Sequence, residues 1–226
     1  MRDLLIIVPT RGRPASMARL AEAVGATTEA ATDLVFALDD DDEPSAEAAA
    51  ALGIYRVTGP RNHLAGWTNL VARHGTKEYR VLASLGDDHV PRTPGWDRLL
   101  LEAIGVMGGA GFAYGNDLLQ GAALPTAVAV SSNVVSALGW MCEPSMRHYC
   151  IDNVWKDLGE GGGCLAYLPD VIIEHVHPAA GRVPPDATHN EAAARDTEDF
   201  AAYALWKAWR MAADIATVQT LRGNGR

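Results

Sequence analysis

The sequence predicts an α/β fold, with a mostly parallel sheet flanked by helices and a further helix at the C-terminus. Short aliphatic runs at residues 4–8 and 34–38 are typical of strands buried on both faces. Helix-like segments, several with proline near the start and glycine near the end, separate these runs. Strands and helices that alternate through short loops indicate a parallel sheet covered by helices.

The first half of the chain shows the most regular alternation. Strands are predicted at residues 4–8, 34–38, 54–57 and 79–85. Helices are predicted from Pro14 to about Gly25, from Pro44 to Gly53, and over residues 64–72 and 96–107. Pro14 suits the first turn of a helix because the N–H that proline lacks would have no helical partner there.

The second half is less evenly interleaved. Strands are predicted at residues 112–114, 126–130, 164–168 and 171–176, and short helices at residues 132–138 and 151–158. A long alanine-rich helix is expected over residues 190–220, with Trp206 and Trp209 in it. The proline-containing segment 182–186 is expected to be a mobile loop.

Composition narrows the class of protein. A chain of 226 residues is expected to form one domain, residues 1–226. The net charge of −9 argues against a generally basic nucleic-acid-binding surface, although a local groove stays open. Three cysteines match no zinc-binding spacing, so we expect reduced thiols in a cytoplasmic protein. No stretch reaches about 18 apolar residues, so no membrane span is expected.

Polar residues follow three of the predicted strands directly. They are Pro9-Thr10-Arg11-Gly12-Arg13 after the first strand, Asp39 to Asp42 after the second, and Gly86-Asp87-Asp88-His89 after the fourth. Ligands bind at the carboxyl ends of strands in open parallel sheets, so these clusters are expected to line one crevice. Two carboxylates held close together repel, which favours a divalent cation between them, and arginines can bind phosphate.

Each cluster also has a plainer interpretation. Two aspartates after a strand are often only a turn. Acidic residues at positions 41–43 favour the dipole at a helix N-terminus, and Arg11 and Arg13 could simply pair with them. Asp152 could be only an N-cap for the helix over residues 151–158.

The motifs together resemble the nucleotide-sugar glycosyltransferases of the GT-A fold, particularly the family 2-like group, over about residues 4–177. The run from Leu5 to Pro14 is similar to that family's opening strand and nucleotide-binding loop, and Pro94-Gly95-Trp96 to its usual motif before the next helix. Gly86-Asp87-Asp88-His89 stands in the place of the family's Asp-X-Asp metal motif and departs from it in spacing. The short chain resembles the compact bacterial and phage members.

The resemblance implies a role for each candidate residue. The nucleotide-sugar site would contain Pro9, Thr10, Arg11, Arg13, Asp39, Asn69 and Asp87. Asp88 and His177 would bind Mn²⁺ or Mg²⁺; His175 is the alternative to His177, and nothing in the sequence decides between them. Asp152 would be the base that deprotonates the acceptor hydroxyl, with inversion at the sugar. Tyr114, Asn116, Asp117 and Trp140 would line the acceptor pocket.

The expected function is therefore transfer of a sugar from a nucleoside-diphosphate sugar, most simply a UDP-sugar, to a hydroxyl. Residues 1–107 would form the nucleotide-binding half, residues 108–180 the acceptor half and residues 188–222 the C-terminal helix. The loop at residues 182–186 would close over the sugar donor. The acceptor could be a glycan, a protein or a modified DNA base. A nucleotidyltransferase, which releases pyrophosphate, and a non-catalytic nucleotide-sugar-binding module are the alternatives.

Overall fold

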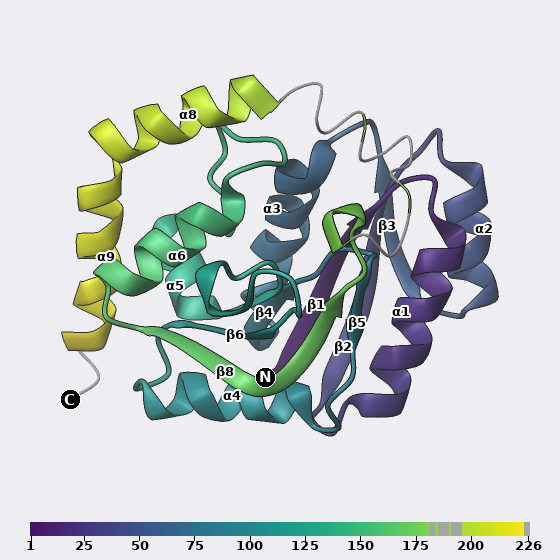
Figure 1. The fold of residues 1–226 in the computed structure, drawn as a ribbon, viewed down its shortest axis with the longest axis horizontal. Coiled ribbons are helices and arrows are strands. Elements are labelled where there is room, and N and C mark those ends of the chain that lie inside the picture. The colour runs from purple at the N-terminus through teal and green to yellow at the C-terminus, as the bar shows by residue number, and fades with distance from the viewer. Residues whose placement is uncertain (181–183, 185–189, 191–195, 224–226) are drawn as a thin grey trace.

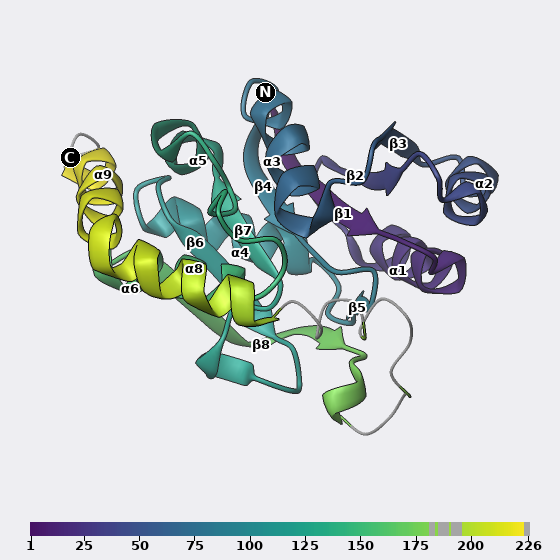
Figure 2. The same ribbon diagram turned by 90° about the horizontal axis from the view of Figure 1, so that it is seen from above.

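An eight-stranded sheet forms the centre of the fold, and helices pack on both of its faces (Figures 1 and 2). The computed structural model describes residues 1–180, Pro184, Asn190 and residues 196–223. The strands are β1 (Arg2–Thr10), β2 (Thr32–Asp39), β3 (Tyr55–Gly59), β4 (Tyr79–Ser84), β5 (His89–Pro91), β6 (Phe112–Asn116), β7 (Val128–Ser131) and β8 (Leu165–His175). Their order across the sheet is β3-β2-β1-β4-β7-β6-β8-β5.

The predicted parallel arrangement is confirmed in the first half of the chain. β1 pairs in parallel with both β2 and β4, and β2 with β3. In the second half β6 pairs with β8 in parallel, whereas β7 runs antiparallel to β4 and β6. The carboxyl ends of β1, β2 and β4 therefore lie at one edge, as the sequence predicts.

The helices of the described residues cover both faces of the sheet. They are α1 (Pro14–Thr27), α2 (Glu43–Ala51), α3 (His63–Gly75), α4 (Trp96–Val106), α5 (Ser132–Leu138), α6 (Ile151–Gly161), α8 (Asp196–Trp209) and α9 (Met211–Gly223). Leu4, Ile6 and Val8 pack against α1 and α4, whereas Leu5 and Ile7 face the core beneath α3 and α5. This alternation explains why β1 is an unbroken aliphatic run, since both of its faces are covered.

Three expectations about elements need correction. The strands predicted at residues 164–168 and 171–176 form the single long strand β8, which bends between its two pairing partners. The short strand β5, which pairs with the end of β8, was not predicted. The single C-terminal helix is instead two helices that meet at Arg210, where the chain turns (Figure 1).

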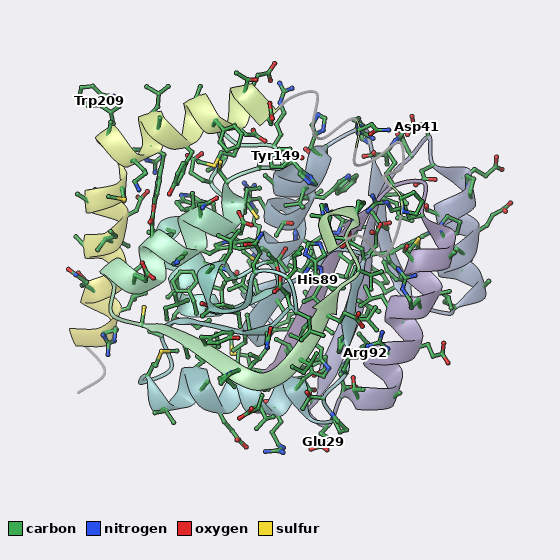
Figure 3. The ribbon with its side chains drawn as sticks, in the orientation of Figure 1. Glu29, Asp41, His89, Arg92, Tyr149 and Trp209 are labelled. Atoms are coloured by element: carbon green, nitrogen blue, oxygen red, sulfur yellow. The ribbon has the colours of Figure 1, made fainter. Side chains whose placement is uncertain are left out.

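The turn at Arg210 has a packing reason. It allows Trp206 on α8 and Val218 on α9 both to be buried, and Trp206 Nε1 donates a hydrogen bond to Asp214 Oδ2 at 2.8 Å. Trp209 instead projects into solvent at the corner (Figure 3). The loop predicted at residues 182–186 lies outside the described residues, apart from Pro184. Across the described chain, none of the helices has the length and apolar character needed to cross a membrane.

Candidate functional site

A pocket of about 500 Å³ opens at the carboxyl ends of β1, β2 and β4. The predicted site residues that line it are Pro9, Thr10, Arg11, Arg13, Asp39, Asp87, Asp88, Asp152 and His177. In Figure 3 the labelled His89 lies near the centre of the fold, with Asp41 on the side of α1 and α2 and Tyr149 beneath α8. Residues far apart in the sequence thus meet in one cavity.

Asp39, at the end of β2, is a buried carboxylate with hydrogen bonds on both oxygens. Oδ1 accepts from Trp67 Nε1 at 2.8 Å and from the Asn62 backbone N–H at 3.2 Å. Oδ2 accepts from Arg61 Nη1 at 2.9 Å and from Arg11 Nη1 at 3.1 Å. The carboxylate therefore holds two guanidinium groups at the pocket wall, where they can face a nucleotide.

Asp87 is the more enclosed member of the aspartate pair. It accepts hydrogen bonds from Thr10 Oγ1 and, at 3.0 Å, from Arg13 Nη1. Arg13 Nη1 also lies 3.7 Å from Asp88 Oδ2, so one guanidinium faces both carboxylates. Burial and the neighbouring Asp88 raise the pKa of Asp87 to about 6, against the opposing effect of Arg13.

Asp88 lies between two histidines. Its Oδ1 is 3.5 Å from His89 Nδ1 and 3.5 Å from His175 Nε2. The histidines are paired residues of the antiparallel strands β5 and β8, and their rings stack with centroids 4.2 Å apart. Ligand atoms of these three residues lie within 4.8 Å of one another, and this set of one oxygen and two nitrogens suits a transition metal.

The two histidines are not equivalent. His89 Nδ1 accepts a hydrogen bond from the Gly86 N–H at 2.9 Å, and its Nε2 lies 3.4 Å from Thr126 Oγ1. Burial lowers the pKa of His89 to about 3, so the ring is neutral and its Nδ1 lone pair faces a backbone donor. The atoms best placed to share a cation are consequently Asp88 Oδ1 and His175 Nε2.

His175 carries the opposite pKa shift. Burial lowers its pKa, but the Asp117 and Asp88 carboxylates outweigh that effect and raise it to about 9. His177, predicted as the metal ligand, also lines the pocket, with its ring centroid 4.9 Å from that of His175. Its Nδ1 accepts from the Ala179 N–H at 3.2 Å. The geometry therefore favours His175 over His177 as the nitrogen ligand of a metal ion. Which of the two histidines binds the metal stays a prediction.

Asp152 reaches the pocket from the first turn of α6. The chain enters this helix through Cys150, a non-glycine residue with φ of 63°. Burial raises the pKa of Asp152 to about 6, while its Oδ1 accepts from the Asn153 N–H at 3.0 Å. A carboxylate with that pKa can accept a proton near neutral pH.

The loop before α6 is held by a residue that the sequence did not indicate. Asp199 on α8 accepts hydrogen bonds from the consecutive backbone N–H groups of Arg147, His148 and Tyr149 at 2.8, 2.9 and 2.7 Å. The Ala65 N–H also donates to the Arg147 carbonyl at 3.1 Å, which ties the loop to α3. Arg61, Trp67, Arg147 and Asp199 line the pocket, and only the fold brings them there.

Five predicted residues are not among those that line the pocket: Asn69, Tyr114, Asn116, Asp117 and Trp140. Asn69 is bonded to the backbone of Met141 and Cys142. Tyr114 donates to the Ala122 carbonyl at 2.9 Å, inside the core. The four residues predicted to line the acceptor pocket are therefore not part of this pocket. Ile151, Trp155 and the loop at residues 147–149 line it together with Asp152.

Comparison with known proteins gives a structural match without a sequence match. No protein-family model and no curated protein matches the chain. The fold is similar to the mannosyltransferase PcManGT from Pyrobaculum calidifontis in complex with GDP-Man and Mn²⁺, with TM-score 0.63, 12% identity and coverage of 97% of this chain and 75% of that one. It is also similar to S. aureus TarS 1-349, with TM-score 0.60, 8% identity and coverage of 76% and 59%.

A third similar structure is glucosyl-3-phosphoglycerate synthase from Mycobacterium tuberculosis, in complex with Mn²⁺, UDP and glucosyl-3-phosphoglycerate. Its TM-score is 0.59 at 12% identity, with coverage of 86% of this chain and 76% of that one. Similarity at such low identity concerns the fold, which here agrees with the resemblance seen in the sequence motifs. The chain has the GT-A fold of the nucleotide-sugar glycosyltransferases.

Proposed function

We propose that the protein is a metal-dependent glycosyltransferase that moves a sugar from a nucleoside-diphosphate sugar to an acceptor hydroxyl. The observation that carries the proposal is the meeting of Asp39, the Asp87–Asp88 pair, His175 and Asp152 in one pocket. Asp39, Asp87 and Asp88 belong to the proposed nucleotide-binding half, residues 1–107, and His175 and Asp152 to the proposed acceptor half, residues 108–180. The complexes of similar structures with GDP-Man, UDP and Mn²⁺ support this reading.

The proposed roles follow from the geometry. Thr10, Asp39 and the two arginines that Asp39 holds, Arg11 and Arg61, bind the nucleoside and its phosphates. Bound Mn²⁺ or Mg²⁺ would supply positive charge to the leaving diphosphate, and Asp88 with His175 would hold it. Asp152 takes the proton of the acceptor hydroxyl as that oxygen bonds to the anomeric carbon and the bond from that carbon to the diphosphate breaks. Attack from the side opposite the leaving group inverts the anomeric centre.

The acceptor is proposed only as a hydroxyl group. A DNA acceptor would need a basic groove, and three basic side chains that could contribute to one, Arg92, Arg98 and Lys207, are engaged in ion pairs. Arg92 lies 2.6 Å from Glu174, and Arg98 lies 2.7 Å from Glu102. Lys207 lies 3.4 Å from Asp157. These ion pairs weigh against modified DNA as the acceptor.

A product assay on a panel of UDP-sugars and GDP-sugars with Mn²⁺ tests the proposal. A glycosyltransferase releases a nucleoside diphosphate, slowly by donor hydrolysis when no acceptor is present. We expect the release to be lost in Asp88→Asn and kept in Asp40→Asn, which changes an exposed aspartate of the same acidic edge. Pyrophosphate as the product would instead indicate a nucleotidyltransferase. Binding without any turnover would indicate a non-catalytic module.

A further inference from the structure

The two ring nitrogens of His175 lie in different surroundings. Nε2 lies 3.5 Å from Asp88 Oδ1, at the pocket. Nδ1 is buried, and within the described chain it has no hydrogen-bond partner. Asp117 Oδ2 lies 3.8 Å from it, slightly beyond hydrogen-bond length. A buried N–H without an acceptor costs free energy. The carboxylate placed next to this nitrogen is that of Asp117.

Asp117 is fixed by the fold. The residue is 2% exposed, and Oδ1 accepts hydrogen bonds from the backbone N–H groups of Leu119, Gln120 and Gly121 at 3.0, 2.7 and 2.8 Å. Oδ2 accepts from Thr126 Oγ1 at 2.8 Å and is the oxygen that faces His175. The His175 N–H also donates to the Asp117 carbonyl at 2.9 Å, which joins the two backbones.

We propose that Asp117 is a positioning residue for the metal site, which accepts the Nδ1 proton of His175 and so directs the Nε2 lone pair towards Asp88 and a divalent cation. Histidines that bind metals commonly donate their second ring N–H to a carboxylate, which fixes both tautomer and ring orientation. The inference rests on the proposed glycosyltransferase function, because that function supplies the cation. It also gives a role to a buried acid that does not line the pocket.

The same carboxylate reaches the second histidine. Thr126 Oγ1 donates to Asp117 Oδ2 and lies 3.4 Å from His89 Nε2. When the Thr126 hydroxyl donates to the carboxylate, its oxygen is left to accept from His89 Nε2–H. That tautomer agrees with the bond from the Gly86 N–H to His89 Nδ1. One carboxylate therefore sets the tautomer of both stacked rings.

A plainer role for Asp117 is to anchor the turn at residues 119–121, and one substitution separates the two roles. Asp117→Asn retains Oδ1 for the three backbone donors. It replaces Oδ2 with an NH₂ group, which donates towards His175 Nδ1 and favours the wrong tautomer. Binding of Mn²⁺, alone and with UDP or GDP, is measured by the electron paramagnetic resonance signal of free Mn²⁺. We expect binding to weaken by about 10- to 100-fold.

The matched control is Asp97→Asn. Asp97 is also fully buried and accepts from two backbone N–H groups, of Glu29 and Ala30, and from the Thr32 hydroxyl. Like Asp117 it does not line the pocket, but these bonds hold residues 29–32 and not a histidine of the proposed metal site. Mn²⁺ affinity in this variant should stay within about twofold of wild type. In a chain that already carries His175→Ala, Asp117→Asn should cause no further loss, because it acts through that ring.

Results that contradict the proposed function differ from results that contradict only the role of Asp117. Wild-type protein that binds no Mn²⁺, with or without nucleotide, would remove both the metal site and the proposed function. Binding that needs Asp88 but is unchanged by Asp117→Asn, or weakened equally with and without His175, would overturn only the role of Asp117. If Asp117→Asn does not fold, ¹⁵N NMR of wild-type histidines with Zn²⁺ decides: we expect the proton of His175 on Nδ1, and a proton on Nε2 contradicts the proposal.

Discussion

A Cβ atom on Gly115 would lie 2.3 Å from the carbonyl oxygen of Val171, a distance that real Cβ atoms do not adopt. At this point β6 and β8 change register: Gly115 pairs with Leu168 and the next residue, Asn116, pairs with Ile172. Residues 169–171 bulge out of the pairing and cross close to β6 because glycine has no side chain there. The bulge lies directly before the part of β8 that carries His175.

We expect Gly115→Ala to displace β8, because the new methyl group meets backbone and cannot be avoided by a rotamer change. The free energy of unfolding should fall by roughly 1–3 kcal/mol, and Mn²⁺ binding should weaken with it. The control is Gly105→Ala in helix α4, where an added Cβ meets nothing within 4 Å. That variant should be equally stable or up to about 1 kcal/mol more stable. Equal urea unfolding of both variants would contradict the close approach.

Asp199→Ala should destabilise the loop before α6, because three backbone N–H groups lose one charged acceptor. We expect the free energy of unfolding to fall by roughly 3 kcal/mol in urea titrations. Glu198→Ala, one position away, removes a 67% exposed side chain that pairs with Arg147 at 3.4 Å. Its effect should stay within about 0.5 kcal/mol. The loop is not anchored by Asp199 if the two variants unfold alike.

Asp152→Asn should make the protein more stable at pH 8 and abolish sugar transfer. Burial raises the pKa of Asp152 to about 6 in the fold, above the value of about 4 for an unfolded chain. The folded state thus binds its proton more tightly, so the carboxylate contributes stability below pH 4 and loses it as the pH rises through 6.

The gain in stability from Asp152→Asn should accordingly be largest above pH 6 and vanish near pH 4. Thermal unfolding measured at a series of pH values tests this. Asp157→Asn, on the same helix, is the control. Asp157 accepts from the Tyr203 hydroxyl at 2.7 Å and pairs with Lys207, so its loss should bring no gain at pH 8. A pH-independent effect of Asp152→Asn would show that its carboxylate is not strained by burial.

Metal binding should become stronger as the pH rises from 6 to 8. Asp117 and Asp88 raise the pKa of His175 to about 9 against the effect of burial, so a cation has to displace a proton from the ring. One displaced proton corresponds to about a tenfold gain in affinity per pH unit below that pKa. Calorimetry in buffers of different ionisation enthalpy measures the proton release. His175→Ala should remove the release, and an unchanged release would exclude His175 as the ligand.

The sequence predicted those parts of the site that depend on local patterns. Thr10 and Asp39 are the last residues of β1 and β2, Asp88 lies in the turn after β4, and the carboxyl ends of parallel strands meet at one edge. Asp152 is likewise fixed by the start of a helix. In these cases the backbone element that carries the residue also determines where its side chain lies.

Other parts depend on contacts that no local pattern contains. Arg61 and Trp67 reach Asp39 only because α3 returns along β1 and β2, and Asp199 reaches its loop only because α8 crosses it. Tyr114, Asn116, Asp117 and Trp140 were expected to line the acceptor pocket. In the fold, Tyr114 and Trp140 are 2% and 6% exposed and belong to the core. Bulky aromatic residues more often fill a core than line a site.

The register change between β6 and β8 divides β8 into a bulge, where an insertion can be accommodated, and a paired part, where the number of residues is fixed. The bulge at residues 169–171 lies outside the pairing, with Asp170 exposed, so an insertion beside Asp170 lengthens the bulge and leaves the pairing from Ile172 onwards in register. From Ile172 onwards the strand is paired up to His175. Loss of one residue there would turn every following side chain to the opposite face and remove the imidazole from Asp88. Chain length in this strand is thus constrained as tightly as residue identity.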